Sequence, residues 1–341
     1  MKILFISPSP IFGGASTATI SIAKMLKANG ADVVYSDEYD TLDVRNGLDV
    51  DHYSFHGHKF KSHNETVRHI MEDVKPTHII WTPLVMPYYY FDILKMKKRG
   101  IRQLTVIHSV SLSQDMKGKV MDFLVSKCLK ALDAIIFVSN YTLQSWRKCG
   151  AVKSSAIVKR VIYNAVSHPD EIRKIKGAKQ IGFVGRFSDE KQPALFCSLS
   201  NNERLKKYVF HALGDGPLLN QCKDAFPNVI YHGNVNDIND IYKNIDLLVL
   251  TSKFENCPMV ILESMSRGIP CVAPNVGGIP EIVKDGVNGK LFDGYNSDDI
   301  AKGIEAVFGS YDIYNKGCYE CSQDYTFERI GKEWESFLSS L

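Results

Sequence analysis

Short runs of Ile, Val and Leu alternate with longer amphipathic stretches along the first half of the chain. The runs have the length of strands, and the stretches between them, such as Ala15–Asn29, have the length and periodicity of helices. The predicted strands of this half are Lys2–Ser7, Asp32–Tyr35, His78–Thr82, Leu104–His108 and Ala134–Val138. Nearly continuous apolar strands joined by helices are typical of parallel sheets covered on both faces. The pattern therefore predicts a doubly wound α/β domain.

The second half repeats this alternation after a polar stretch without apolar periodicity. Its predicted strands are Gln180–Gly185, Tyr208–Leu213, Val229–His232, Asp246–Leu250, Pro270–Ala273 and Gly289–Phe292. We predict an N-terminal domain at 1–165, a linker at 166–179, a C-terminal domain at 180–322 and a C-terminal helix at 323–341. Two such Rossmann-like domains would face each other across a cleft, because open α/β sheets bind ligands at the carboxyl ends of their strands.

Composition excludes several classes of protein. Of the 341 residues, 45% are hydrophobic and 23% charged, which is the balance of a globular protein rather than a disordered or collagenous one. No apolar run approaches the ~18–20 residues of a membrane span. At the N-terminus the apolar run is only Ile3–Ile6, too short for a secretory signal, and the eight cysteines are scattered. We therefore expect a cytoplasmic protein with reduced thiols.

Charge is unevenly distributed: residues 1–165 carry 22 Lys and Arg against 14 Asp and Glu, whereas the remainder is net acidic. A basic half often faces an anionic partner, which could be nucleic acid, a phospholipid surface or a phosphorylated substrate. No nucleic-acid-binding module is recognisable, so we expect no nucleic-acid partner. Met86–Arg102 joins aromatic residues to a Lys/Arg cluster, which indicates either a solvated helix end or a peripheral contact with anionic lipid on the inner face of a membrane.

The most informative stretch for chemistry is Thr251–Gly268, which follows a predicted strand. We predict Asn256 as the N-cap of a helix whose first turn contains Pro258. The free N–H groups of Met259 and Val260 would then form a phosphate site at the positive end of the helix. The strand, the cap and the helix start together predict an anion site at the edge of the sheet.

Charged side chains surround this predicted anion site. Glu255 and Glu263 bracket it, and each carboxylate could hold the hydroxyls of one sugar. The alternative for this segment is a capped surface helix with two solvated glutamates. Arg186 and Lys191, in the loop of Gly182–Lys191, pair a planar donor fork with a mobile point charge, which would suit a diphosphate leaving group. The alternative interpretation is that Arg186 and Lys191 are two solvated cations in a loop.

A loop with two glycines, Gly13 and Gly14, follows the first strand and precedes the first helix, where it would let a substrate approach the backbone. The dinucleotide fingerprint G-x-G-x-x-G and the Walker pattern are absent. Readings as an NAD-binding or P-loop protein therefore lose their main support.

In this combination the chain resembles the family 4 retaining glycosyltransferases, a group with the GT-B fold and a Glu-x7-Glu motif. The resemblance rests on Gly182–Lys191 (GFVGRFSDEK), Gly214–Leu218 (GDGPL), Val276–Phe292 (VGGIPEIVKDGVNGKLF) and the two glutamates. It runs almost from end to end and is more specific in the second half. It implies that nucleotide-sugar is bound without a cofactor and without a metal ion.

The resemblance assigns roles in the second domain. It implies that Glu255 contacts the donor sugar, that Glu263 contacts the nucleotide ribose, and that Arg186 and Lys191 bind the diphosphate. The chain departs from the family at Asn256, where glycine is more usual after the first motif glutamate. This departure changes the room beside the sugar, so the identity of the donor cannot be borrowed from a relative.

In the first domain the resemblance implies that Gly14, with Gly13 beside it, lies against the donor phosphates. His108 matches the histidine that faces the transferred sugar, and the C-terminal helix at 323–341 would cross back onto this domain. Asp49-Val50-Asp51 spells the metal-binding D-x-D of the other major glycosyltransferase architecture. Because it stands far from the strand-end motifs, we interpret it as a solvated turn.

The resemblance predicts a retaining glycosyltransferase that moves a sugar from a nucleotide diphosphate donor to a hydroxyl of a glycan or lipid-linked acceptor. UDP-sugars are the family's commonest donors, and bacterial-type cell-surface polysaccharide or glycolipid synthesis is the expected setting. The alternatives are a catalytically silent nucleotide-sugar-binding relative and another GT-B enzyme such as a nucleotide-sugar epimerase. The residues leave the base, the sugar, the acceptor and the oligomeric state open.

Overall fold

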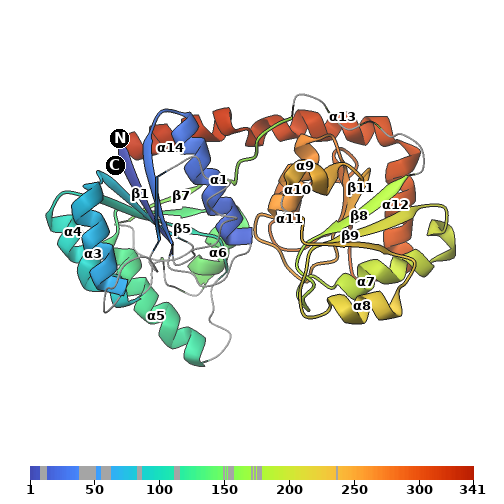
Figure 1. Ribbon diagram of the computed structural model, residues 1–341, viewed down its shortest axis with the longest axis horizontal. Helices are drawn as coiled ribbons and strands as arrows, with labels where there is room; N and C mark the ends of the chain where they lie inside the picture. The colour runs from blue at the N-terminus through green and yellow to red at the C-terminus, as the bar shows by residue number, and fades with distance from the viewer. Residues whose placement is uncertain are drawn as a thin grey trace. The chain divides into compact units, whose positions relative to one another are not determined.

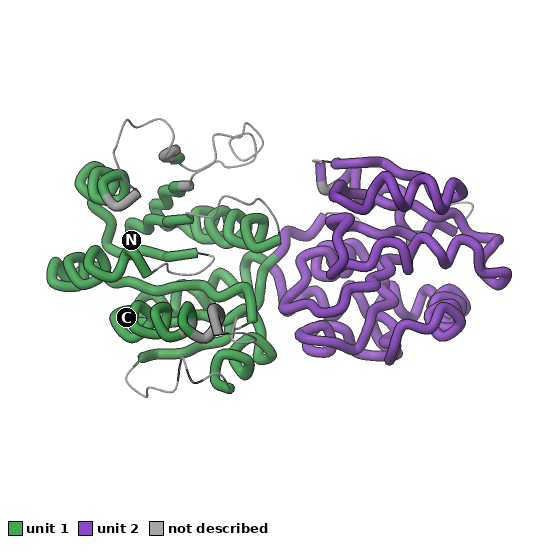
Figure 2. The backbone as a smooth tube through the Cα atoms, turned by 90° about the horizontal axis from the view of Figure 1, so that it is seen from below, with its two compact units in different colours: residues 1–165, 327–341 green, residues 166–326 purple. Residues whose placement is uncertain are grey.

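The computed structural model describes residues 1–7, 14–37, 51–54, 63–82, 87–110, 116–148, 150, 152, 157–169, 172, 174, 179–235 and 237–341. These residues form two compact units (Figures 1 and 2). Unit 1 consists of Met1–Ala165 and Phe327–Leu341, and unit 2 is Val166–Thr326. The stretch 166–179, which the sequence suggested as a linker, is therefore counted with unit 2, where Val166 forms a β-bridge with Thr326.

Unit 1 is built on a parallel sheet of seven strands in the order β3-β2-β1-β4-β5-β6-β7. The strands are β1 (Lys2–Ser7), β2 (Asp32–Asp37), β3 (Asp51–Ser54), β4 (His78–Trp81), β5 (Arg102–Ile107), β6 (Ala134–Phe137) and β7 (Val158–Val161). The helices are α1 (Gly14–Ala28), α3 (His63–Val74), α4 (Tyr90–Lys98), α5 (Met116–Ala131), α6 (Asn140–Lys148) and α14 (Phe327–Ser339), with a 3-10 turn η2 at Pro87–Tyr89. The strand order reverses between β1 and β4, as in a doubly wound fold.

The apolar runs become the buried centre of this sheet, as the sequence pattern predicts. In β1, Ile3, Leu4 and Phe5 are fully buried, because helices cover both faces of the sheet (Figure 1). The last helix of the chain, α14, contacts α1 and so belongs to unit 1. It buries Ile330, Trp334 and Phe337 at helical spacing.

Unit 2 repeats the architecture with a parallel six-stranded sheet in the order β10-β9-β8-β11-β12-β13. Its strands are β8 (Gln180–Val184), β9 (Val209–Leu213), β10 (Ile230–Gly233), β11 (Leu247–Val249), β12 (Cys271–Pro274) and β13 (Gly289–Phe292). Its helices are α7 (Pro193–Ser198), α8 (Leu219–Ala225), α9 (Ile238–Tyr242), α10 (Met259–Ser266), α11 (Ile279–Ile282), α12 (Ser297–Gly309) and α13 (Tyr311–Ser322). The reversal of strand order falls between β8 and β11. The predicted fold class, two doubly wound Rossmann-like domains, is confirmed.

The structure corrects one reading of the first domain. Asp51, interpreted as part of a solvated turn, is the first residue of β3 and pairs with Val34 of β2. A polar edge strand, Asp-His-Tyr-Ser, lacks the apolar run that identifies a buried strand, which is why the sequence pattern missed it. Asp49 and Val50 lie outside the described residues.

The described residues contain neither a membrane-spanning helix nor a cluster of metal ligands. No helix among them combines the length and the apolar character that crossing a membrane requires. Over the same part of the chain, no three His, Cys, Asp or Glu side chains gather closely enough to hold a metal ion.

Candidate functional site

The predicted site residues of unit 2 gather where its strand order reverses. β8 and β11 are neighbours in the sheet, with Leu247 opposite Ile181 and Leu248 opposite Gly182. The loop after β8 carries Arg186 and Lys191, and the loop after β11 leads to α10. Such a reversal leaves room for a ligand at the carboxyl ends of the two strands.

The loop that carries Arg186 is held by the backbone of the turn after β9. The Gly185 N–H donates to the Leu213 carbonyl at 3.0 Å, and the Phe187 N–H donates to the Asp215 carbonyl at 2.8 Å. Gly214 has a φ of +125°, and a Cβ there would overlap the Gly185 carbonyl oxygen. The two glycine motifs are therefore one packed structure, and it presents the Arg186 side chain to solvent.

Lys191 and Glu255 are brought together by the loops after β8 and β11. The Lys191 ammonium lies 2.7 Å from Oε1 of Glu255, and the Ser252 hydroxyl donates to the same oxygen at 2.8 Å. The Thr251 hydroxyl donates to the Lys191 carbonyl at 2.9 Å and fixes one loop to the other. Glu255 is only 9% exposed, so its carboxylate is held in one place. Sequence reasoning missed Thr251 and Ser252.

The backbone of Glu255 is fixed by a third loop. Its carbonyl accepts a hydrogen bond from the Gly278 N–H at 2.8 Å. Gly277 has a φ of +61°, and a Cβ at this position would overlap the same carbonyl oxygen. Only glycine fits this combination of backbone conformation and close approach. The segment Val276-Gly277-Gly278 therefore holds the backbone of Glu255 in place.

The N-terminus of α10 differs from the sequence prediction. The helix begins at Met259, and Pro258, not Asn256, occupies the N-cap position, with no side-chain cap. The Pro258 backbone is extended at φ −67° and ψ 116°, which places the turn two residues later than predicted. The Asn256 Oδ1 atom is buried and has no hydrogen-bond partner among the described residues.

The predicted anion donors are nevertheless at the helix start. The Ile261 N–H donates to the Pro258 carbonyl at 3.2 Å, whereas the N–H groups of Met259 and Val260 have no acceptor among the described residues. Free N–H groups at the positive end of an eight-residue helix favour a negatively charged ligand.

Glu263 is held inside unit 2 by α9. The Tyr242 hydroxyl lies 2.9 Å from Oε2 of Glu263 and 3.1 Å from the Val260 carbonyl. Arg267 stacks over the Tyr242 ring at 5.2 Å and donates to the Glu263 carbonyl at 3.0 Å. Burial raises the pKa of the Glu263 carboxyl, and the Tyr242 hydrogen bond and the Arg267 charge only partly oppose this. No local signal in the sequence marks Tyr242.

Three of the predicted site residues, Gly13, Gly14 and His108, belong to unit 1. Gly13 lies outside the described residues. Gly14 is the exposed first residue of α1, and beyond its own helix no described residue has an atom within 4 Å of the position that a Cβ would take. His108 directly follows β5 and is 8% exposed, and its Nε2 has no hydrogen-bond partner within the described part of the chain. Burial lowers the pKa of His108 to about 4, so its imidazole is neutral near pH 7.

This pKa predicts a pH dependence of stability. An unfolded histidine binds a proton near pH 6.5, whereas folded His108 does so only near pH 4. Stability is therefore fully present above the unfolded pKa and is lost as pH falls between the two values, by up to about 3 kcal/mol. In thermal melts from pH 7 to 4, we expect wild type to lose more stability than His108→Gln. Parallel curves for the two proteins would contradict the buried neutral imidazole.

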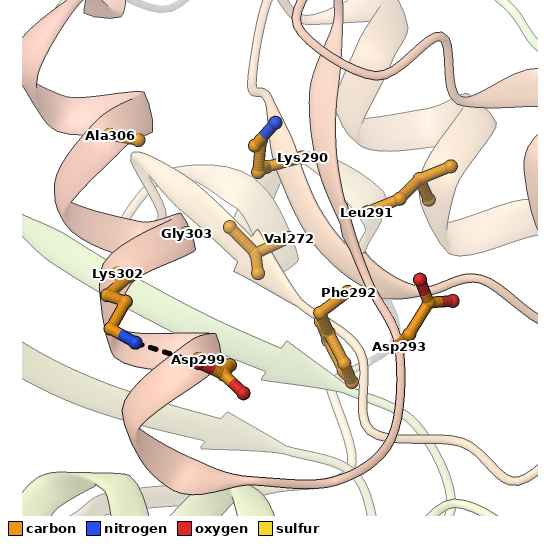
Figure 3. Close-up of a pocket in the computed structure, with 9 residues that line it drawn as sticks. All are labelled: Val272, Lys290, Leu291, Phe292, Asp293, Asp299, Lys302, Gly303 and Ala306. Atoms are coloured by element: carbon orange, nitrogen blue, oxygen red, sulfur yellow. Dashed lines mark hydrogen bonds and ion pairs between the residues drawn. The ribbon is translucent and has the colours of Figure 1, made fainter.

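A hollow of about 430 Å³ lies elsewhere in unit 2, between β12, β13 and α12 (Figure 3). Its lysines are paired: Lys302 lies 2.9 Å from Asp299, and Lys290 lies 2.7 Å from Asp285. None of the predicted site residues lines it. It therefore does not replace the strand-end site as the candidate for chemistry.

Two family models match the chain, and each covers most of one unit. "Glycosyltransferase Family 4" matches residues 12–168, and "Glycosyl transferases group 1" matches residues 178–310. The two parallel-sheet units have the fold of the GT-B class. The chain belongs to the family 4 glycosyltransferases.

Individual proteins are also similar to this chain. A Klebsiella pneumoniae protein, named "Uncharacterized 41.2 kDa protein in cps region", is 27% identical over 252 residues, which cover 68% of this chain and 66% of the relative. The Escherichia coli UDP-Gal:alpha-D-GlcNAc-diphosphoundecaprenol alpha-1,3-galactosyltransferase is 30% identical over 171 residues, which cover 45% of this chain and 44% of that enzyme. The matched stretch thus spans two thirds of these relatives or less.

The fold has a solved counterpart. The crystal structure of Anabaena Alr3699/HepE in complex with UDP and glucose matches with a TM-score of 0.81 at 20% identity, over the full length of both chains. At this identity the likeness concerns the fold.

Proposed function

We propose that the protein transfers a sugar from a UDP-sugar to a hydroxyl of a glycan or lipid-linked acceptor, with retention of configuration, in the synthesis of cell-surface polysaccharide or glycolipid. The observation that carries the proposal is the Lys191–Glu255 pair beside the free N-terminus of α10. The name of the E. coli relative, a UDP-Gal-dependent transferase acting on a diphosphoundecaprenol-linked sugar, supports the donor and acceptor classes. A cytoplasmic location remains a prediction.

The strand-end geometry suits a nucleoside diphosphate sugar. Arg186, Lys191 and the N–H groups at the start of α10 would together face the diphosphate, because all three supply positive charge or hydrogen-bond donors. Glu263 would accept hydrogen bonds from the ribose hydroxyls, which would also stabilise its charged form against burial. Glu255 engages Lys191 and Ser252 through Oε1, so Oε2 is the oxygen that would accept from a sugar hydroxyl.

The proposed reaction takes place on one face of the sugar. The bond between the anomeric carbon and the phosphate oxygen breaks, and its electron pair leaves with UDP. The acceptor hydroxyl attacks from the same face and gives its proton to that phosphate oxygen. Arg186, Lys191 and the α10 N-terminus would stabilise the negative charge that develops on the leaving group. His108, being neutral, would act as a hydrogen-bonding group rather than as a cation. Independence from a metal ion remains a prediction.

The alternative of a catalytically silent nucleotide-sugar-binding protein has less support. Loss of binding or catalytic groups is the usual route to silence, and this chain keeps Arg186, Lys191, Glu255 and Glu263 in an ordered arrangement. No observation in the described residues favours an epimerase.

The test is a transfer assay with α-configured UDP-sugars and simple alkyl glycoside acceptors. We expect release of UDP that depends on the acceptor, and proton NMR of the product should show an α linkage. A β-linked product would contradict retention. Purified, folded protein that releases no UDP from any donor and acceptor pair would favour the silent-relative alternative.

A further inference from the structure

Two histidines face each other on neighbouring strands of unit 2. His211 is the middle residue of β9, and His232 is the third residue of β10, the edge strand of the sheet. His211 Nδ1 lies 2.9 Å from His232 Nε2, and the ring centres are 5.2 Å apart. His211 is 6% exposed, whereas His232 is exposed. Neither residue was singled out from the sequence, and the proposed reaction leaves both without a role.

His232 stands where the pairing of the two strands is irregular. Tyr231 pairs with Ala212, and two residues later Gly233 pairs with the next residue of β9. His232 is thus an extra residue in β10, and Gly233 after it turns the chain at a φ of +67°. Such a β-bulge bends its strand and leaves the extra residue without a partner in the ladder. The contact with the β9 histidine therefore holds a residue that the sheet itself does not.

The backbone after this bulge holds the turn after β9. The Gly233 carbonyl accepts a hydrogen bond from the Gly214 N–H at 2.8 Å. Gly214 lies directly against the Gly185 carbonyl oxygen, in the loop that carries Arg186. The carboxyl ends of β10, β9 and β8 are thus joined in a row. A displacement of the bulge would reach the Arg186 loop through two backbone contacts.

The hydrogen bonds of His211 determine which of its nitrogens carries the proton. Its Nε2 lies 2.5 Å from Gln180 Oε1, an oxygen that can only accept, so Nε2 carries the proton. Nδ1 of the neutral ring is then a lone pair, which accepts the N–H of His232 Nε2. One additional proton leaves this bond intact, because His232 Nδ1 can take it. A second proton must go to His211 Nδ1 and breaks the bond, because two N–H groups then face each other.

The surroundings of His211 oppose this second protonation. Burial lowers the pKa of His211, the charge of His232 lowers it further, and the charge of Asp246 partly opposes both. Asp246 is fully buried and accepts a hydrogen bond from the Gln180 N–H at 2.9 Å. The pair therefore stays hydrogen-bonded through neutral pH, and it is lost only when pH falls below the ordinary histidine value of about 6.5.

We propose that His211 and His232 are positioning residues of the donor site: their hydrogen bond holds the β10 bulge and, through the row of strand ends, the loop that carries Arg186. The inference rests on the proposed function. Neither ring would touch the donor, but together they keep the arginine loop ordered before the donor binds. An ordered loop binds a ligand more tightly, because less conformational entropy is lost on binding.

The test is calorimetric titration of UDP into wild type, His232→Ala, His232→Gln and the control His168→Ala at about pH 8. We expect UDP affinity to be about three- to tenfold weaker in His232→Ala, which corresponds to one lost hydrogen bond. His232→Gln should bind UDP like wild type, because its amide N–H can replace Nε2. His168 is a half-buried histidine of the same unit and lies 2.8 Å from the Ser322 hydroxyl. Its removal costs a similar contact and should leave UDP affinity unchanged.

A pH series separates positioning from a general contribution to stability. As pH falls to about 5, wild type should lose several-fold more UDP affinity than His232→Gln. Glutamine takes no proton, and its amide can turn its oxygen toward a protonated His211. The titration of UDP itself is common to both proteins and cancels in the ratio of their affinities.

Four results would each overturn the positioning role while wild type still binds UDP, and would leave the proposed function standing. They are equal affinity of wild type and His232→Ala, an equal loss in His168→Ala, no recovery of binding in His232→Gln, and parallel pH curves for wild type and His232→Gln. Absence of UDP binding to folded wild type would overturn the positioning role and the proposed function together.

Discussion

Replacing Arg186 by alanine should lower kcat by about 10²–10³, equivalent to about 2.7–4 kcal/mol of transition-state stabilisation. Arg186 is exposed on a loop whose backbone is fixed by hydrogen bonds to Leu213 and Asp215. A donor group on a rigid loop can stabilise charge on a leaving diphosphate without reorganising. Because its side chain is exposed, stability should be nearly unchanged. Initial rates with a saturating UDP-sugar would measure the effect.

The control for this variant is Arg204→Ala. Arg204 is a surface arginine of the same unit that pairs with Glu305. Its removal subtracts the same charge without touching the strand-end loops, so the transfer rate should stay within about twofold of wild type. If Arg186→Ala retained the wild-type kcat, or if both variants lost rate equally, Arg186 would have no specific role at the leaving group.

Gly277→Ala should reduce both stability and activity. The added methyl group would overlap the Glu255 carbonyl oxygen, and the positive φ already disfavours any L side chain by about 1–2 kcal/mol. The loop can accept the methyl group only by moving away from Glu255, which breaks the hydrogen bond from Gly278. Displacing a substrate-positioning residue by about 1 Å can cost around 10²-fold in rate. We therefore expect a drop in kcat/KM of about that size together with a lower melting temperature.

The matched control is Gly286→Ala. Gly286 has a φ of +78°, but apart from its two chain neighbours no described residue has an atom within 4 Å of its Cβ position. It should show the backbone penalty alone, with a wild-type kcat/KM once the protein is folded. Equal effects of the two substitutions on activity would show that the loop around Gly277 does not position Glu255.

The fold was predictable because its signals are local. Each buried strand of the two sheets is an apolar run in the sequence, and the motif loops follow β8 and β11 directly. β3 was missed because an edge strand can be polar. The N-cap at Asn256 was wrong because proline at 258 keeps an extended backbone and delays the helix.

The contacts that hold the site were not predictable in the same way. Lys191 and Glu255 were each assigned a separate contact with the donor, yet they lie 2.7 Å apart. Their pairing depends on two strands that are distant in sequence and adjacent in the sheet. Tyr242 lies on another helix than Glu263, and neither local sequence contains a motif that predicts their hydrogen bond. Tertiary packing created these relations, so periodicity and motif spacing could not show them.

We claim that a nucleoside diphosphate binds at the carboxyl ends of β8 and β11. Calorimetric titration of UDP into wild type, Glu263→Ala and the surface control Glu203→Ala tests it most directly. We predict tight binding to wild type and Glu203→Ala and at least tenfold weaker binding to Glu263→Ala, because the variant loses the carboxylate that would hold the ribose. Absence of UDP binding to folded wild type, or equal affinity in all three proteins, would contradict the claim.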